Sequence, residues 1–259
     1  QNAYKGEYIE SIGKEFIINN IVKYDDVGSI LKDLSSDPEE EIDQIIVDLK
    51  RLDEKIWKLV KSFSLESIIK SIKNDLKDFN VDFDSWFNES SLGELSDSSS
   101  QISNSINKLK IDGMAYEKDG AVWLNTDSSG DDKHRVLVRD DGRATYFASD
   151  VAYHKNKVDR GYDDLINVWG ADHHGYIKRI EASIEALGSN KEKLIVKLVQ
   201  FANLFKKGKK VKMSTRTGEF FTLKDLIEEI GADAARFYYL SKQADQHLDF
   251  DLDLAKSDS

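Results

Sequence analysis

Apolar residues in the first part of the chain recur at the three-and-four spacing of amphipathic helices. One stripe runs between residues 42 and 63 and a second between residues 65 and 76, and each would lie on one face of a helix. The only proline, Pro38, falls where a first helical residue is expected, after a suitable N-cap in Asp37. This pattern predicts a mainly helical region whose apolar stripes serve packing, with contact to RNA or to another domain as the minority alternative.

The pattern changes to short strands near residue 113. Apolar runs at 121–124 and 136–139 predict two strands. The triplet Asp140-Asp141-Gly142 then predicts a hairpin turn that leads into a further strand at 143–147.

A buried strand is expected at 165–169, followed by a helix with apolar residues at 177, 180, 184 and 187 that ends at Gly188. Alternation of helices with such a strand is expected in half of a doubly wound α/β fold. The sequence therefore predicts an α/β chain that divides near residue 113.

Composition narrows the class of protein. The chain has 259 residues, of which 40% are hydrophobic, and a formal net charge of −11. It has no cysteine for a disulfide framework and no apolar run as long as a membrane span. The acidic balance disfavours indiscriminate binding to nucleic acid. We expect a cytoplasmic protein of one or two domains without a membrane anchor.

A basic segment stands out against this acidic background. Five lysines and one arginine lie between Lys206 and Arg216 with no acid among them, and Gly208 and Gly218 flank the segment. Ammonium and guanidinium groups can neutralise a triphosphate during phosphoryl chemistry. Composition alone favours a solvated lysine-rich loop instead.

A second segment, Gly170-Ala-Asp-His-His-Gly-Tyr176, lies where the predicted strand hands over to the predicted helix. Ligands bind at this edge of open α/β sheets. Asp172 can accept hydrogen bonds from a ribose, and Gly170 permits close approach to the backbone. A simple turn is the alternative for the glycines. A zinc pair at His173 and His174 is disfavoured, because adjacent side chains point apart and no cysteine is available.

Together, Lys212-Met213-Ser214-Thr215-Arg216 and Gly170–Tyr176 resemble the catalytic domain of class I aminoacyl-tRNA synthetases, and specifically arginyl-tRNA synthetases of bacterial type. Further segments of the resemblance are 4–9, 84–92, 130–137, 144–154 and 247–255, so that it covers essentially the whole chain. It implies an α/β fold that is part of a Rossmann-type catalytic domain with a largely helical insertion.

The resemblance also implies a domain plan. Residues 1–113 would form the helical insertion region. Residues 114–241 would form the second half of the catalytic domain, with the signature loop at 209–218. Residues 242–259 would start the connection to a helical anticodon-binding domain.

Two family features are absent from the sequence: the His-x-Gly-His signature and the long carboxyl-terminal helical domain. We therefore expect the chain to be an incomplete part of a larger synthetase and to be inactive alone. Thr215 stands where many class I enzymes carry a second lysine. The resemblance therefore leaves open whether another lysine takes the place of that residue at the phosphates of ATP.

Roles of individual residues follow from the resemblance. Arginine is expected to bind Tyr146, Asp150 and His173, and a carboxylate such as Asp150 suits its planar guanidinium because two parallel hydrogen bonds can form. A plain helix-start role is the alternative for Asp150. The residues expected to bind ATP are Gly170, Asp172, His173, Val211, Lys212 and Met213. The catalytic residues would be Lys212, Ser214 and Arg216, with Lys209 and Lys210 as auxiliaries and no protein-bound metal.

The implied reaction is the ligation of arginine to tRNA(Arg) by a monomeric enzyme. Arginine would be activated by Mg-ATP, with Mg²⁺ as part of the substrate complex, and the arginyl group would pass to the 3′ end of the tRNA. Two other classes stay open: a synthetase-like protein that binds arginine or tRNA without joining them, and a nucleotidyltransferase of related fold.

Overall fold

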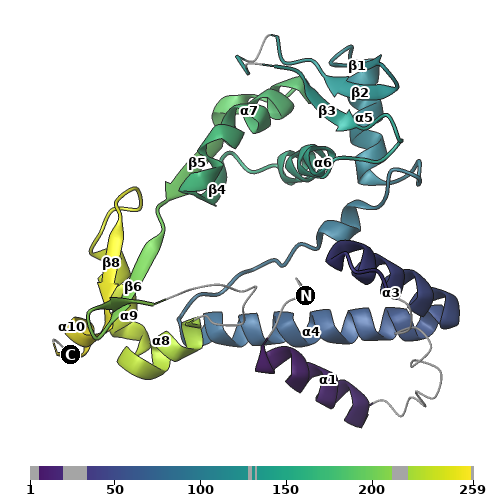
Figure 1. Cartoon of the computed structure of the whole chain (residues 1–259). Helices are drawn as coiled ribbons and strands as arrows, with labels where there is room; N and C mark the ends of the chain where they lie inside the picture. The colour runs from purple at the N-terminus through teal and green to yellow at the C-terminus, as the bar shows by residue number, and fades with distance from the viewer. Residues whose placement is uncertain (1–5, 20–33, 128–129, 132, 212–220, 258–259) are drawn as a thin grey trace. The chain divides into compact units, whose positions relative to one another are not determined.

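The computed structural model describes residues 6–19, 34–127, 130–131, 133–211 and 221–257. The chain divides into two compact units (Figure 1). The first consists of residues 1–82, 202–241 and 249–259, and the second of residues 83–201 and 242–248. These units are defined by packing, and the domain plan with a boundary near residue 113 stays a prediction.

The first unit begins with three helices, α1 (Glu7–Asn19), α3 (Pro38–Leu52) and α4 (Glu54–Asp78). Asp37 caps α3 as predicted, because the backbone N–H of Glu40 donates to its Oδ1 at 3.2 Å.

The boundaries of the helices do not coincide with those of the two apolar stripes. Asp53 accepts hydrogen bonds from the backbone N–H groups of Lys55 and Ile56 and so starts α4 within the first stripe. α4 then continues without a break through the rest of the first stripe and the whole of the second. The rings of Phe16 in α1 and Phe63 in α4 contact each other, with 5.4 Å between their centres.

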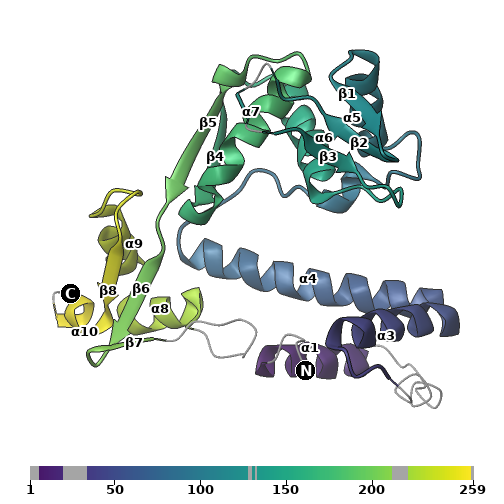
Figure 2. The same ribbon diagram turned by 45° about the horizontal axis from the view of Figure 1, so that its top comes forward.

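A three-stranded sheet with the order β7-β6-β8 also belongs to this unit. Its strands are β6 (Ala202–Lys206), β7 (Lys209–Lys210) and β8 (Leu248–Asp251). The helices beside the sheet are α8 (Leu223–Ile230), α9 (Ala232–Leu240) and α10 (Leu252–Ser257) (Figure 2). Phe250 is fully buried and contacts the rings of Tyr238 and Tyr239.

The second unit contains the antiparallel sheet β1-β2-β3. Its strands are β1 (Ala115–Lys118), β2 (Ala121–Leu124) and β3 (Arg135–Val138). The 3₁₀ turn η1 (Glu89–Leu92) and the helices α5 (Gln101–Ile111) and α6 (Tyr146–Asp159) complete this part. Leu109, Leu124, Leu137 and Val151 are fully buried in its core.

The predicted strand at 143–147 is wrong beyond its first residues. A single bridge joins Val138 to Ala144, and α6 begins at Tyr146. The predicted turn is present, because the N–H of Gly142 donates to the carbonyl oxygen of Arg139 at 3.0 Å and Gly142 has φ 81°.

The remaining part of the second unit is a parallel β-α-β arrangement, as the alternating pattern predicted. β4 (Leu165–Gly170) pairs in parallel with β5 (Leu194–Val199). The connection runs through η2 (Ala171–Tyr176), α7 (Ile177–Ala186) and η3 (Lys191–Lys193) (Figures 1 and 2). β4 was expected to be a buried strand. Ile166 and Val168 are instead 60% and 67% exposed.

Within the described residues, the structure has no helix that is both long and apolar enough to cross a membrane.

Candidate functional site

The N-terminus of α6 carries the first predicted site residues. The Thr145 hydroxyl accepts from the N–H of Ala148 at 3.3 Å and donates to the carbonyl oxygen of Val136 at 2.9 Å. The chain therefore turns directly from the sheet into α6, and Tyr146 is the first helical residue rather than the end of a strand. Its side chain is 86% exposed, and Asp150 follows one turn later on the same helix.

Asp150 is a half-buried carboxylate with one described hydrogen-bond donor. Tyr176 Oη donates to its Oδ2 at 2.5 Å, and Oδ1 accepts no hydrogen bond from the described residues. Burial raises the pKa of Asp150, and the charge of Glu89 raises it further. The hydrogen bond from Tyr176 and the charges of His173 and Lys157 act in the opposite direction on this pKa. A cation that binds Oδ1 would relieve the cost of this buried charge.

Asp150 opens into a cavity of about 290 Å³ beside α6. Aromatic side chains of Phe87, Tyr146 and Tyr153 form much of its wall, and Glu89 supplies a second carboxylate. The remaining lining residues are Leu92 and Ser149. Two carboxylates among aromatic rings are suited to a planar organic cation, which can pair with the charges and stack on the rings.

Glu89 is a site residue that the sequence analysis missed. The resemblance places its segment, residues 84–92, in the family's insertion and gives Glu89 no chemical role. Glu89 lies in η1, far from α6 in the sequence, and no spacing rule connects the two. The match of residues 84–92 to the family was the one available signal.

A larger cavity of about 590 Å³ lies between α6 and β4. It brings together four predicted residues, Tyr146, Asp150, Gly170 and His173, along with Trp169 and Tyr176. Asp172 is not in its lining. A Cβ atom at Gly170 would lie 2.5 Å from Asp172 Oδ1, so any larger residue at 170 would push that carboxylate away from the end of the strand.

A buried polar network fixes α6 against β4. Asn167 Nδ2 donates to His154 Nε2 at 2.9 Å, so the proton of the ring lies on Nδ1, which donates to the carbonyl oxygen of Asp150 at 2.8 Å. Lys157 donates to Asn167 Oδ1 at 2.6 Å. Burial lowers the pKa of His154 to about 4. The sequence left open whether Tyr153 and His154 pack or line the site. Both residues line the cavity, and both also pack, since Tyr153 stacks on Phe87 at 4.6 Å.

The basic segment lies in the first unit, and most of its predicted site residues, Lys212, Met213, Ser214 and Arg216, lie outside the described residues. Val211 is described, and its N–H donates to the carbonyl oxygen of Leu204 at 2.8 Å. Lys209 and Lys210 form the short strand β7.

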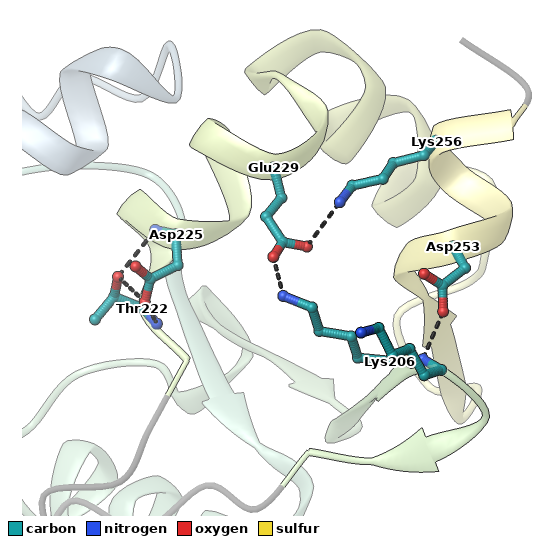
Figure 3. Close-up of polar contacts among 7 residues, drawn as sticks. Lys206, Thr222, Asp225, Glu229, Asp253 and Lys256 are labelled. Carbon is teal, nitrogen blue, oxygen red and sulfur yellow. Dashed lines mark hydrogen bonds and ion pairs between the residues drawn. The ribbon is translucent and has the colours of Figure 1, made fainter.

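Ion pairs hold the residues on either side of 212–220 (Figure 3). Glu229 on α8 binds Lys206, the last residue of β6, and also Lys256 of α10 at 3.3 Å. Lys206 Nζ lies 5.7 Å from the centre of the Phe221 ring. The N–H of Lys207 donates to Asp253 Oδ2 at 2.5 Å. β6 is thereby anchored to both α8 and α10.

A capping box starts α8. Thr222 Oγ1 accepts from the N–H of Asp225 at 2.9 Å, and the N–H of Thr222 donates to Asp225 Oδ2 at 2.8 Å (Figure 3). The Thr222 hydroxyl also donates to Asp225 Oδ2 at 2.7 Å, and this hydrogen bond, together with the one from the N–H of Thr222, lowers the pKa of Asp225. The described residues on either side of 212–220 are therefore held by Glu229, Asp253 and the Thr222–Asp225 capping box.

The described residues contain no group of three or more histidine, cysteine, aspartate or glutamate side chains arranged to hold a metal ion. His173 Nε2 lies 3.6 Å from Asp172 Oδ2 as a solvent-exposed pair.

A family model of class I tRNA synthetases (R), catalytic domain, matches residues 16–251. The chain belongs to this family. Its α/β fold is thus that of a class I synthetase catalytic domain, and the fold predicted from the sequence is confirmed.

Curated members of the family are longer than this chain. The chain is 48% identical over 266 residues to an arginine–tRNA ligase of Vesicomyosocius okutanii and 43% identical over 279 residues to one of Acinetobacter baumannii. Each match covers 100% of this chain and 46% of the relative. The chain therefore spans about half the length of these relatives.

A solved structure from Campylobacter jejuni, described as an arginyl tRNA synthetase, is 35% identical to this chain with a TM-score of 0.76. The similarity covers 98% of this chain and 48% of that structure. The family and the extent of the match agree with the resemblance found in the sequence.

Proposed function

We propose that the full-length protein containing these 259 residues is an arginine–tRNA ligase. The observation that carries this proposal is the pair of carboxylates, Asp150 and Glu89, in an aromatic cavity of a class I synthetase (R) catalytic domain. Asp150 Oδ1 is open to a ligand, and burial makes its uncompensated charge costly. Arginine supplies the matching planar cation.

Recognition of arginine rests on charge and shape together. The guanidinium donates to Asp150, and Tyr176 holds the carboxylate from the other side through its 2.5 Å hydrogen bond. Glu89 adds a second negative charge, and Tyr146 and Ser149 line the same cavity. Hydrogen bonds to charged groups contribute about 1.5–3 kcal/mol each, so the pair should strongly favour arginine over a neutral analogue of the same shape.

Activation of arginine uses ATP as Mg-ATP. An oxygen of the arginine carboxylate attacks the α-phosphorus, the bond to pyrophosphate breaks, and arginyl-adenylate forms. Gly170, Asp172 and His173 at the end of β4 bind the adenosine in this proposal, with Val211 and Met213. Lys212, Ser214 and Arg216 act on the phosphates, where positive charge stabilises the leaving pyrophosphate. Mg²⁺ enters with the nucleotide and needs no dedicated protein site.

Transfer completes the reaction. A hydroxyl of the terminal ribose of tRNA(Arg) attacks the carbonyl carbon of the adenylate, AMP leaves with the electron pair of the broken bond, and the hydroxyl proton is released. We further propose that the full-length protein acts as a cytoplasmic monomer without a membrane anchor, in keeping with the acidic, cysteine-free composition.

The sharpest test compares arginine with citrulline, its neutral isostere, in the full-length protein and in Asp150→Asn. Calorimetric titration should show that the substitution weakens arginine binding at least ~10-fold and leaves citrulline binding almost unchanged. Asp163→Asn, an exposed substitution outside both cavities, is the matched control and should preserve the preference for arginine. An unchanged arginine-to-citrulline ratio in Asp150→Asn would remove Asp150 from the site.

A further inference from the structure

A third cavity, of about 270 Å³, shares Glu89, Tyr146 and Ser149 with the first cavity, the proposed arginine pocket. Its other walls carry two arginines, Arg139 and Arg143. The two neighbouring cavities thus differ in charge: the first is lined by two carboxylates, and the third by two guanidinium groups and the shared carboxylate of Glu89.

The two arginines are in different states. Arg143 is paired, because its Nε donates to Asp141 Oδ2 at 2.8 Å and the ion pair lowers the pKa of Asp141. Arg139 is exposed, and its guanidinium forms no hydrogen bond or ion pair with the described residues.

The main chain of Arg139 is nevertheless fixed. Its N–H donates to the carbonyl oxygen of Arg143 at 2.9 Å, and its carbonyl oxygen accepts from the N–H of Gly142 at 3.0 Å. The hairpin turn therefore presents an unpaired guanidinium from a defined backbone position, which is suited to a bidentate anion such as a phosphodiester.

We propose that Arg139 binds a phosphate of the terminal nucleotides at the 3′ end of the tRNA. The inference rests on the proposed function, because transfer requires the terminal ribose to reach the carboxyl end of an arginine whose side chain is held by Asp150 and Glu89. Asp150 and Glu89 together repel a phosphate from the first cavity, whereas in the third cavity Glu89 is accompanied by two arginines. Arg139 attracts the phosphate to this third cavity. The distribution of charge thus steers substrate groups of opposite sign into adjacent cavities.

The test measures binding of tRNA(Arg) to the full-length protein by fluorescence anisotropy at several salt concentrations. Two transcripts are compared, one intact and one without its three terminal nucleotides. Arg139→Ala should weaken binding of the intact transcript about five-fold or more and leave the shortened transcript unaffected. The slope of log affinity against log salt should fall by about 0.7, as expected for one lost contact to single-stranded phosphate.

Three controls separate this role from others. Lys193→Ala removes one positive charge elsewhere in the same unit and should change neither transcript. Arg139→Lys should restore the salt slope. Charging kinetics should show that the Michaelis constants for arginine and ATP are unchanged in Arg139→Ala.

Any of three results for Arg139→Ala would overturn the assignment of Arg139. These are an equal loss of affinity for both transcripts, an unchanged slope of log affinity against log salt, and a rise only in the Michaelis constant for ATP. Failure of the unaltered full-length protein to charge tRNA with arginine would instead contradict the proposed function, and the binding comparison would still decide whether Arg139 contacts the tRNA end.

Discussion

At Asp150 a carboxylate lies half-buried with one described donor, the hydroxyl of Tyr176. Burial raises its pKa above the ordinary value of 3.8. A group whose pKa is higher in the folded chain stabilises the fold only while it is protonated, and this contribution is lost as the pH rises through the folded value. At neutral pH the ionised Asp150 therefore lowers stability in the absence of a bound cation.

Asp150→Asn should for this reason melt at a higher temperature than the unaltered protein at pH 7, although it binds arginine poorly. The advantage should disappear below about pH 4, where both proteins carry a neutral group at this position. Thermal unfolding, monitored by circular dichroism at pH values from 7 down to below about 4, checks the prediction. A lower melting temperature at pH 7 would show that the charge of Asp150 is already compensated.

Lys212 carries the proposed chemistry of the basic segment. Lys212→Ala should slow adenylate formation at least ~10-fold and leave the affinity for arginine nearly unchanged, because the charge acts on the leaving pyrophosphate. Single-turnover kinetics with tRNA present separates the two effects, and Lys193→Ala provides a matched loss of charge. Weakened arginine binding with a normal adenylation rate would contradict the assignment.

Sequence reasoning reached part of this site. The resemblance proposed Tyr146, Asp150, Gly170 and His173, and the structure brings these four residues to one cavity. It did not reach Glu89, because the contact between η1 and α6 depends on how the second unit packs.

Among the elements, α6 and β4 depend on each other through His154 and Asn167. The folded pKa of His154 is lowered to about 4 from 6.5. Its neutral form therefore contributes stability that is complete above pH 6.5 and is lost as the pH falls toward 4.

His154→Gln should make the free energy of unfolding less dependent on pH in this window, by at most about 1.4 kcal/mol per pH unit. Denaturant titrations at pH 4 to 7 measure the slope, and His247→Gln, a substitution at an exposed histidine, should leave it unchanged. Identical slopes in all three proteins would show that His154 is not buried in its neutral form.

The residues flanking the basic segment depend on Glu229. Glu229→Gln weakens the ion pairs to Lys206 and Lys256 and should raise the Michaelis constant for ATP about two- to five-fold, with no change in that for arginine. Glu228→Gln is the matched control, since Glu228 is an exposed neighbour with one ion pair, to Lys224 at 3.9 Å. Equal effects of the two substitutions would mean that the Glu229 pairs do not position the segment.

Elements were predictable where local signals agree. The apolar spacing and Gly188 predicted α7. Two elements were misjudged because a side chain ends or starts a helix against the apolar pattern. Asp53 divides α3 from α4, and Thr145 starts α6 at a residue that was placed in a strand.

For the whole molecule, the sequence indicated a class I synthetase fold through two motifs that lie in different compact units. Its apolar pattern could not show how the units divide, because the described residues of 202–241 belong to the same compact unit as the N-terminal helices, although they are distant from those helices in the sequence. β4 pairs only with β5 among the described strands, and Ile166 and Val168 are exposed on it. By the resemblance, a His-x-Gly-His segment forms part of the nucleotide site, and this sequence does not contain it. We therefore predict that the 259 residues alone charge no tRNA.

The most direct test of the account is the charging of total tRNA by the full-length protein, measured with each labelled amino acid in turn and with or without ATP. We predict ATP-dependent incorporation of arginine and of no other amino acid, and loss of that incorporation at low arginine concentration in Asp150→Asn. Charging with a different amino acid, or arginine binding without any charging of tRNA, would contradict the assignment of this chain to an arginine–tRNA ligase.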